Sequence, residues 1–209
     1  MVRDLARSVL AAPSRPGLPE GDGGPVVVVP GIAAGDVMMR PLRRFLRRLG
    51  HDVRSADLGV VTDDVLRLSD ALTDRVVSIA DQTGRPVALV GWSIGGLLAR
   101  EVARFQPASV RTVITFGTPV YGGPSYTVLA PLYDEAKLAS IRAMIDERHA
   151  LRIERPITAI RSVADGIVAS EACIDPDAEN IAVASTHLGM PFDPTVWKLV
   201  AERLGAGPS

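Results

Sequence analysis

The stretch Val87-Ala88-Leu89-Val90-Gly91-Trp92-Ser93-Ile94-Gly95-Gly96 decides the fold that this 209-residue sequence predicts. Its four leading apolar residues indicate a strand buried on both faces, and a helical pattern runs from Ser93 to about Phe105. Between strand and helix, Gly91–Gly95 fits the pattern G-x-S-x-G, in which a serine occupies a sharp, strained turn with its hydroxyl exposed. Ser93 is therefore a candidate nucleophile. The alternative is a glycine-rich turn that serves only close packing.

Outward from this turn, short apolar runs alternate with helical patterns along the whole chain. We expect strands at residues 26–29, 52–58, 87–90, 111–116, 157–163 and 180–184, and helices at residues 41–49, 62–83, 93–105, 134–151 and 194–204. Strands that alternate with helices form parallel sheets, because each crossover returns over a sheet face. The sequence therefore predicts an α/β fold of about six mostly parallel strands covered by helices on both faces, with a small cap after the third-last strand.

The composition excludes several classes of function. Apolar residues make up 47% of the chain and charged residues 22%, which is typical of a globular protein. The formal net charge of −1 argues against nucleic acid as a partner, since that needs a large basic surface. The single cysteine, Cys173, excludes an internal disulfide and a multi-cysteine metal site. We expect no metal and no cofactor.

The N-terminal residues indicate an arm followed by one domain. Residues 13–25 are rich in proline and glycine, so we expect a flexible arm at 1–24 and a folded domain at 25–209. The start of the chain does not fit a signal peptide, and no run of 18 apolar residues occurs. We therefore expect a cytoplasmic protein without stable membrane insertion. The sequence does not decide the oligomeric state.

A nucleophilic serine needs a base, because its hydroxyl is weakly reactive at neutral pH. Where a serine occupies such a turn, the acid and then the histidine follow it in the chain. His51 precedes Ser93 and is expected at the surface, and His149 is expected to be a solvated residue at a helix end. His187, in the loop after the last expected strand, is the candidate base. The alternative is a loop histidine held by backbone groups.

The candidate acid is Asp165. It follows the strand expected at 157–163, so it belongs to the same sheet edge as Ser93 and His187. Its role would be to hold the imidazole tautomer and stabilise the imidazolium. Asp165-Gly166 is also a common turn sequence. Asp175 and Asp177 are the substitutes, although Asp175-Pro176 has the character of a turn.

A tetrahedral oxyanion needs two backbone N–H donors. One is expected from Ile94, the residue after the nucleophile, and the other from the loop that follows the first strand. In that loop, Gly31 allows a turn that directs the amide of Ile32 inward.

These residues resemble an α/β-hydrolase of the lipase/esterase type. The matching segments cover roughly residues 25–205 and comprise the loop at Pro30-Gly31, the GWSIGG turn, Gly117-Thr118-Pro119, Ser162 to Gly166 and the loop around His187. The resemblance implies a triad of Ser93, Asp165 and His187, with the amides of Ile32 and Ile94 as oxyanion donors. The chain departs from many relatives at Pro30, where they have histidine before glycine, and at Trp92, where many lipases have histidine. The first two strands of the family also have no counterpart.

A cap is expected at about residues 121–151, after the strand end at Gly117. Tyr121, Tyr126 and Leu129 of this segment, together with Trp92, are expected to line a substrate pocket. Such an apolar wall would suit an acyl chain, although the same residues would serve equally well as ordinary core contacts.

The sequence therefore predicts a serine hydrolase that cleaves a small-molecule or lipid carboxylic ester through an acyl-enzyme. One alternative is an acyltransferase that uses the same triad. Another is a non-catalytic binding protein on the same scaffold. A basic helix face is expected to be solvated rather than to bind phosphate or lipid: Arg40, Arg43, Arg44, Arg47 and Arg48.

Overall fold

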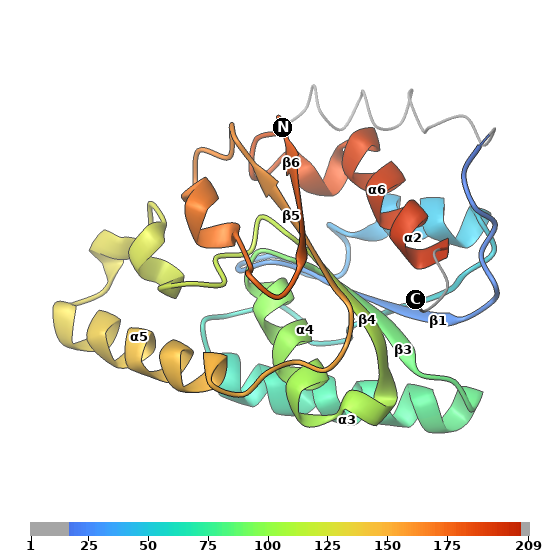
Figure 1. Cartoon of the computed structure of the whole chain (residues 1–209), viewed down its shortest axis with the longest axis horizontal. Helices are drawn as coiled ribbons and strands as arrows, with labels where there is room; N and C mark the ends of the chain where they lie inside the picture. The colour runs from blue at the N-terminus through green and yellow to red at the C-terminus, as the bar shows by residue number, and fades with distance from the viewer. Residues whose placement is uncertain (1–16, 206–209) are drawn as a thin grey trace.

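A six-stranded, all-parallel sheet forms the centre of the computed structural model, which describes residues 17–205 (Figure 1). The strand order is β2-β1-β3-β4-β5-β6, and the strands are β1 (Pro25–Val29), β2 (Asp52–Ser55), β3 (Val87–Trp92), β4 (Val110–Phe116), β5 (Ile157–Ser162) and β6 (Glu179–Val183). Each strand pairs in parallel with its neighbours. The predicted α/β architecture is confirmed.

Helices cover both faces of this sheet. Helices α2 (Arg40–Arg48) and α6 (Pro194–Gly205) lie on one face, and α3 (Val65–Thr83) and α4 (Ile94–Phe105) lie on the other (Figure 1). Alternate residues of β1 serve the two cores: Val26 and Val28 pack in the α2–α6 layer, whereas Val27 and Val29 pack in the α3–α4 layer. A strand buried on both faces needs an unbroken apolar run, which explains the sequence of β1.

The two largest differences between expected and observed element boundaries, three residues each, have local causes. Strand β2 ends at Ser55 because the carboxylate of Asp36 accepts hydrogen bonds from the amides of Ala56 and Asp57, at 3.2 and 3.1 Å, and draws the backbone away from the sheet. Helix α3 begins at Val65, later than expected, because the side chain of Asp64 caps it.

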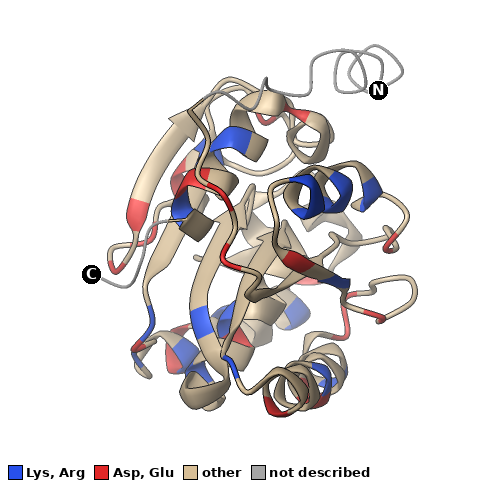
Figure 2. Cartoon of the chain, turned by 90° about the vertical axis from the view of Figure 1, so that its right-hand side faces the viewer, with Lys and Arg blue, Asp and Glu red and all other residues tan. Residues whose placement is uncertain are grey.

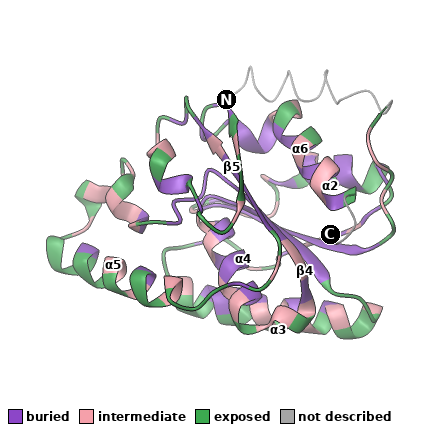
Figure 3. Cartoon of the chain, viewed as in Figure 1, coloured by how far each residue is buried: buried purple, intermediate pink, exposed green. Residues whose placement is uncertain are grey.

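The segment after β4 departs from the layered core. It contains the short 3-10 turns η2 (Gly123–Tyr126) and η3 (Ala130–Leu132), followed by helix α5 (Glu135–His149). Only Leu138 and Ile145 of α5 are buried, and the helix projects beside α4 with a largely exposed surface (Figure 3). Within residues 17–205, no helix has the length and apolarity needed to cross a membrane.

Residues 1–16 of the expected N-terminal arm lie outside the described residues, whereas residues 17–24 contact the domain. The amide of Gly21 donates to the carbonyl of Leu49, at 2.6 Å. Asp22 pairs with Arg85, and Leu18 packs against the core. This part of the arm is therefore built into the fold.

The arginine-rich face of α2 is among the positive regions drawn in Figure 2. Four of its five arginines are exposed, as expected, but Arg43 is buried and pairs with Asp36 at 2.9 Å. Arg43 therefore fixes the loop after β1 to α2, and the expectation that it is solvated is wrong.

Candidate active site

Ser93 occupies a strained turn between β3 and α4. Its backbone angles, φ 55° and ψ −127°, are rarely adopted by a residue with a side chain. Two hydrogen bonds of 2.9 Å hold it there: its amide donates to the carbonyl of Phe116, and its carbonyl accepts from the hydroxyl of Thr118. Phe116 is the last residue of β4 and Thr118 follows two residues later, so the neighbouring strand and the loop after it fix the position of the serine.

Glycines around Ser93 allow three backbone segments to meet. A Cβ added at Gly95 would lie 2.6 Å from the carbonyl oxygen of Val29, and one added at Gly91 would overlap the first turn of α4. A Cβ at Gly31 would lie 3.2 Å from the Cβ of Ser93. Any side chain at these positions would separate β1, β3 and the start of α4.

Asp165 and His187 form a buried hydrogen-bonded pair. Nδ1 of His187 lies 2.8 Å from Oδ2 of Asp165, and the side chains of both residues are at most 5% exposed. The other carboxylate oxygen accepts hydrogen bonds from the amides of Ile167 and Val168, at 3.0 and 2.6 Å. The amide of His187 also donates to the carbonyl of Asp165. Two of these bonds thus join Asp165 to His187, and the other two hold the carboxylate in the loop after β5.

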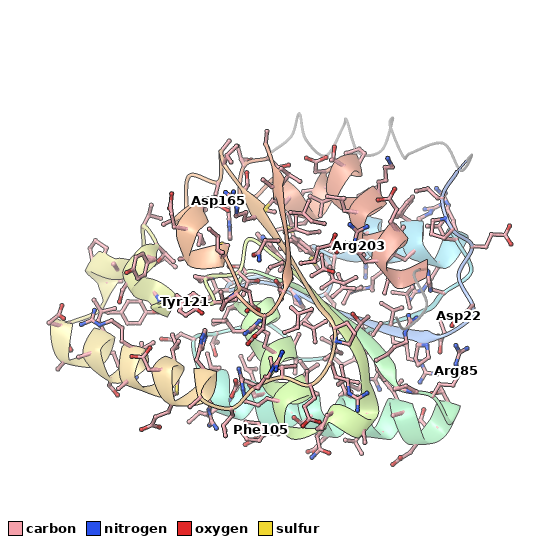
Figure 4. All side chains as sticks on the ribbon, viewed as in Figure 1. Asp22, Arg85, Phe105, Tyr121, Asp165 and Arg203 are labelled. Atoms are coloured by element: carbon pink, nitrogen blue, oxygen red, sulfur yellow. The ribbon has the colours of Figure 1, made fainter. Side chains whose placement is uncertain are left out.

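This pair lies beside the serine turn at the carboxyl edge of the sheet. Asp165 follows β5, as Figure 4 indicates, and His187 follows β6. The imidazole ring lies 5.4 Å from the ring of Trp92, the residue before Ser93, measured between centroids. A Cβ at Gly117, next to Phe116, would lie 3.0 Å from the same imidazole. A proton on Nδ1 is donated to Asp165, which leaves Nε2 without a hydrogen-bond partner among the described residues.

Two backbone amides have the properties expected of oxyanion donors. Ile32 and Ile94 line the same cavity as Ser93, and neither amide donates a hydrogen bond to a described residue. The loop that carries Ile32 is held by a turn and by a bond from the amide of Ala33 to the carbonyl of Val61, at 2.8 Å. Ile94 is the first residue of α4, where the helix dipole favours negative charge.

A cavity of about 490 Å³ opens from Ser93 between α4, α5 and the start of α3. Much of its wall is apolar. The apolar side chains that line it are Ile32, Val65, Leu66, Ile94, Leu97, Pro119, Val120, Pro124, Leu129, Ile141, Met144 and Ile145. A cavity of this size and apolar character is typical of a site for a small ligand.

Three of the four residues expected to line the pocket are not part of this cavity wall. Leu129 lines it, but Trp92 is 3% exposed and belongs to the core of the α2–α6 layer. Tyr121 packs against His149 of α5 (Figure 4), with ring centroids 4.5 Å apart, and Tyr126 is half exposed. Among the three tyrosines, Tyr133 reaches the cavity.

The two other histidines also differ from expectation. His51 is buried, and neither of its ring nitrogens has a hydrogen-bond partner among the described residues. His149 lines the cavity, and its Nε2 lies 2.8 Å from the carbonyl oxygen of Val120. Burial is the largest cause of the lowered pKa of both imidazoles. Neither residue is the solvated histidine that the sequence predicts.

The substitute acids and the cysteine have other environments. Asp175 is buried and pairs with Arg100 of α4, while Asp177 is half exposed and lies 3.9 Å from Arg152. Cys173 is buried, and burial raises the pKa of its thiol to about 12. A thiol of this kind is a poor nucleophile at neutral pH.

Sequence reasoning assigned no role to two residues that support the site. Thr118 bonds the carbonyl of Ser93, and its position directly after a strand end next to a glycine was an available signal. Met190 is fully buried, and its sulfur would lie 3.1 Å from a Cβ at Gly117, beside His187. No pattern in the sequence indicates that contact.

Comparisons with known proteins identify the architecture. No family model matches the chain, and neither does any curated protein. Among solved structures, the mature form of Bacillus licheniformis lipase BlEst2 has a TM-score of 0.67 and 18% identity, over 92% of this chain and 94% of that one. Aspergillus fumigatus lipase B has a TM-score of 0.68 and 20% identity, over 95% of this chain and 57% of that one. Mouse alpha/beta hydrolase domain-containing protein 10 has a TM-score of 0.55 and 18% identity, over 90% of this chain and 94% of that one. The chain therefore adopts the α/β-hydrolase fold.

Proposed function

We propose that this protein is a carboxylic ester hydrolase that forms an acyl-enzyme on Ser93. The observation that carries the proposal is the buried Asp165–His187 pair beside a strained serine at the head of an apolar cavity. Several structural neighbours are described as lipases or lipolytic enzymes, which agrees with this reaction class.

In the acylation step, Oγ of Ser93 attacks the ester carbonyl carbon while Nε2 of His187 accepts the hydroxyl proton. The amides of Ile32 and Ile94 bind the oxyanion of the tetrahedral intermediate. Collapse of this intermediate breaks the bond to the alkoxy group, which leaves as the alcohol with the proton from His187. Asp165 keeps Nδ1 protonated and stabilises the imidazolium throughout.

In the deacylation step, a water molecule takes the place of the alcohol. Nε2 of His187 accepts its proton as the water oxygen attacks the acyl carbon. The second tetrahedral intermediate then releases the carboxylic acid, and Ser93 regains its proton from His187. We assign residues 25–209 to the hydrolase domain, against which residues 17–24 pack, with 121–151 as a cap that contributes Leu129 and residues of α5 to the cavity wall.

Hydrolysis of p-nitrophenyl esters from acetate to palmitate by the wild type and Ser93→Ala tests this proposal. We expect turnover by the wild type and a loss on the order of 10⁶-fold in kcat for Ser93→Ala, since the variant lacks the nucleophile. Ser140→Ala, which alters a hydroxyl elsewhere in the cavity wall, is the matched control and should retain activity. Circular dichroism checks that each protein is folded. Turnover retained by Ser93→Ala, or none by folded wild type, would contradict the proposal.

A further inference from the structure

Helix α4 forms the floor of the cavity from the nucleophile to a charged end. Ser93 precedes the helix, and Ile94, Leu97, Arg100 and Arg104 line the cavity at intervals of three or four residues. These intervals place the residues on one face of a helix. At a rise of about 1.5 Å per residue, Arg100 lies about 10 Å and Arg104 about 16 Å along the axis from Ser93.

The character of the floor changes along this axis. The first turns present Ile94 and Leu97, and Ile141 and Ile145 of α5 contribute apolar surface to the same cavity. Beyond them the floor presents Arg100, Glu101 and Arg104. A purely hydrocarbon chain that starts at Ser93 and follows α4 would end against charged side chains, which is unfavourable because those groups would lose water without gaining a partner.

The charged end of the cavity, here called the arginine end, has three arginines (Arg100, Arg104 and Arg148) but only two carboxylates (Asp175 and Glu101). Arg100 pairs with Asp175, while Arg104 and Arg148 both pair with Glu101, the latter at 3.1 Å. Among the charged groups, Glu101, Arg100, Arg148 and Asp175 have the largest effects on the pKa of Arg104. Burial lowers the pKa of Arg104, Glu101 opposes that effect, and the neighbouring arginines add to it. His149, which also lines the cavity, cannot compensate this charge, because an imidazole is either neutral or positive; burial lowers its pKa and so disfavours the positive form.

The other charged groups in the cavity wall belong to a different region. Asp63 and Asp64 precede α3, and Lys137 lies in the first turn of α5, eleven residues or about 16 Å from Arg148. Asp64 pairs with Arg67, and Asp63 lies 3.5 Å from the hydroxyl of Tyr133. These two carboxylates therefore have other partners and do not neutralise the arginine end.

Part of this cluster connects α4 to α5 and to the residues that follow α5. Arg148 of α5 pairs with Glu101 of α4, and Arg104 donates to the carbonyl of Leu151. A single arginine paired with Glu101 would connect the two helices. Glu101 instead pairs with both Arg104 and Arg148, which leaves a surplus positive charge beside the cavity that begins at Ser93.

We propose that this arginine end binds a carboxylate at the far end of the acyl chain, so that the preferred substrates are monoesters of dicarboxylic acids. This inference rests on the proposed ester hydrolysis at Ser93. Arginine suits the role, since its planar donors bind a carboxylate in bidentate geometry. The distance of about 10 Å from Ser93 to Arg100, the first arginine of this end, corresponds to roughly eight carbons in an extended chain, because each bond of about 1.5 Å advances the zigzag chain by about 1.3 Å.

Mono-p-nitrophenyl esters of C4 to C10 dicarboxylic acids, compared with neutral acyl esters of equal length, provide the test. We expect the wild type to hydrolyse the octanedioate monoester with at least tenfold higher kcat/KM than the octanoate ester at low salt. The preference should shrink as NaCl is added, because salt screens the attraction. Equal or better hydrolysis of the neutral ester would overturn this inference while the proposed hydrolase stands. Loss of all Ser93-dependent turnover would instead contradict the hydrolase itself, and the inference with it.

Arg148→Leu tests the source of the preference, because it removes the surplus charge and leaves Glu101 paired with Arg104. We expect kcat/KM for the octanedioate monoester to fall about tenfold relative to that for the octanoate ester, with partial recovery in Arg148→Lys. Arg142→Leu is the matched control on α5, since Arg142 pairs with Glu135 and is not part of the cavity wall. An unchanged preference in Arg148→Leu would overturn the assignment.

A second measurement needs no variant. Octanedioate should inhibit the wild-type hydrolysis of p-nitrophenyl butyrate at a concentration at least tenfold lower than octanoate. Equal inhibition by the two acids would contradict the inference independently of how Arg148→Leu folds.

Discussion

At the scale of single residues, Asp165 is held so closely that the exchange of one oxygen for an amide nitrogen has a defined result. Asp165→Asn replaces the Oδ2 acceptor of His187 with an amide that can present a donor to Nδ1. The imidazole would then favour the tautomer with its proton on Nε2, which cannot accept the proton of Ser93. We expect kcat to fall on the order of 10⁴-fold, less than for Ser93→Ala. Steady-state kinetics checks the loss, and circular dichroism checks the fold. Unchanged activity would exclude Asp165 as the acid.

His51 gives a prediction about stability rather than catalysis. Burial, with a contribution from Arg111, lowers its pKa below the 6.5 of an exposed histidine, although Asp22 acts in the opposite direction. The unfolded chain therefore binds a proton at a higher pH than the folded protein does. The stability associated with neutral His51 is complete above about pH 6.5 and is lost as the pH falls toward the folded-state pKa.

His51→Leu removes this titration and fills the site with an apolar side chain. We expect the free energy of unfolding, measured in urea at pH 8 and pH 5, to differ less between the two pH values in the variant than in the wild type. A residual difference should persist, since the pKa of His149 is lowered as well. An identical pH dependence in both proteins would show that His51 does not titrate differently on folding.

At the scale of elements, the start of α4 depends on its contact with the end of β1. A Cβ at Gly95 would meet the backbone carbonyls of Val29 and Pro30, which cannot move as a flexible side chain does. Gly95→Ala should therefore push α4 away from β1 and separate the amides of Ile32 and Ile94. We expect a lower melting temperature and at least a tenfold loss of kcat, although alanine favours helices by about 1 kcal/mol.

Asp74→Ala, an exposed position on α3, is the control for this prediction and should leave the melting temperature and kcat almost unchanged. Thermal unfolding and ester hydrolysis are measured on both variants. If Gly95→Ala behaved like Asp74→Ala, the close contact between α4 and β1 would have no role in the site.

The elements that the sequence predicts well are those with local patterns. Strand β3, the turn at Ser93 and helix α4 follow from apolar periodicity and small residues within one short stretch. The pocket wall is harder to predict from the sequence, because the path of residues 117–134 is irregular and no periodicity indicates which side chains face inward. Tyr133 reaches the cavity while Tyr121 and Tyr126 do not, and nothing in their spacing separates them. His51 is buried where residues 17–24 return to the domain, beside Gly21, which is a contact between distant parts of the fold.

At the scale of the whole molecule, a buried ion pair joins α4 to the segment between β5 and β6. Arg100 and Asp175 are 75 residues apart, and their side chains are 8% and 2% exposed. Asp175 also accepts a bond from the amide of Asp177, at 3.1 Å, and its backbone bonds Asn180, so the carboxylate belongs to a fixed turn. The pair therefore connects the part of the fold that carries Ser93 with the part that carries Asp165 and His187.

Asp175→Asn removes the charge of one partner and leaves Arg100 buried without compensation. We expect the free energy of unfolding in urea at pH 7 to fall by about 3–5 kcal/mol, because an unpaired buried charge is far more costly than a lost surface interaction. Glu135→Gln breaks the exposed pair with Arg142 and should change stability by less than about 1 kcal/mol. The double variant Arg100→Met/Asp175→Leu should recover much of the loss, since removing both charges also removes the cost of burying one alone. A loss in Asp175→Asn as small as that in Glu135→Gln would mean that Arg100 finds water or another partner, and that the two parts of the fold are not held together by this pair.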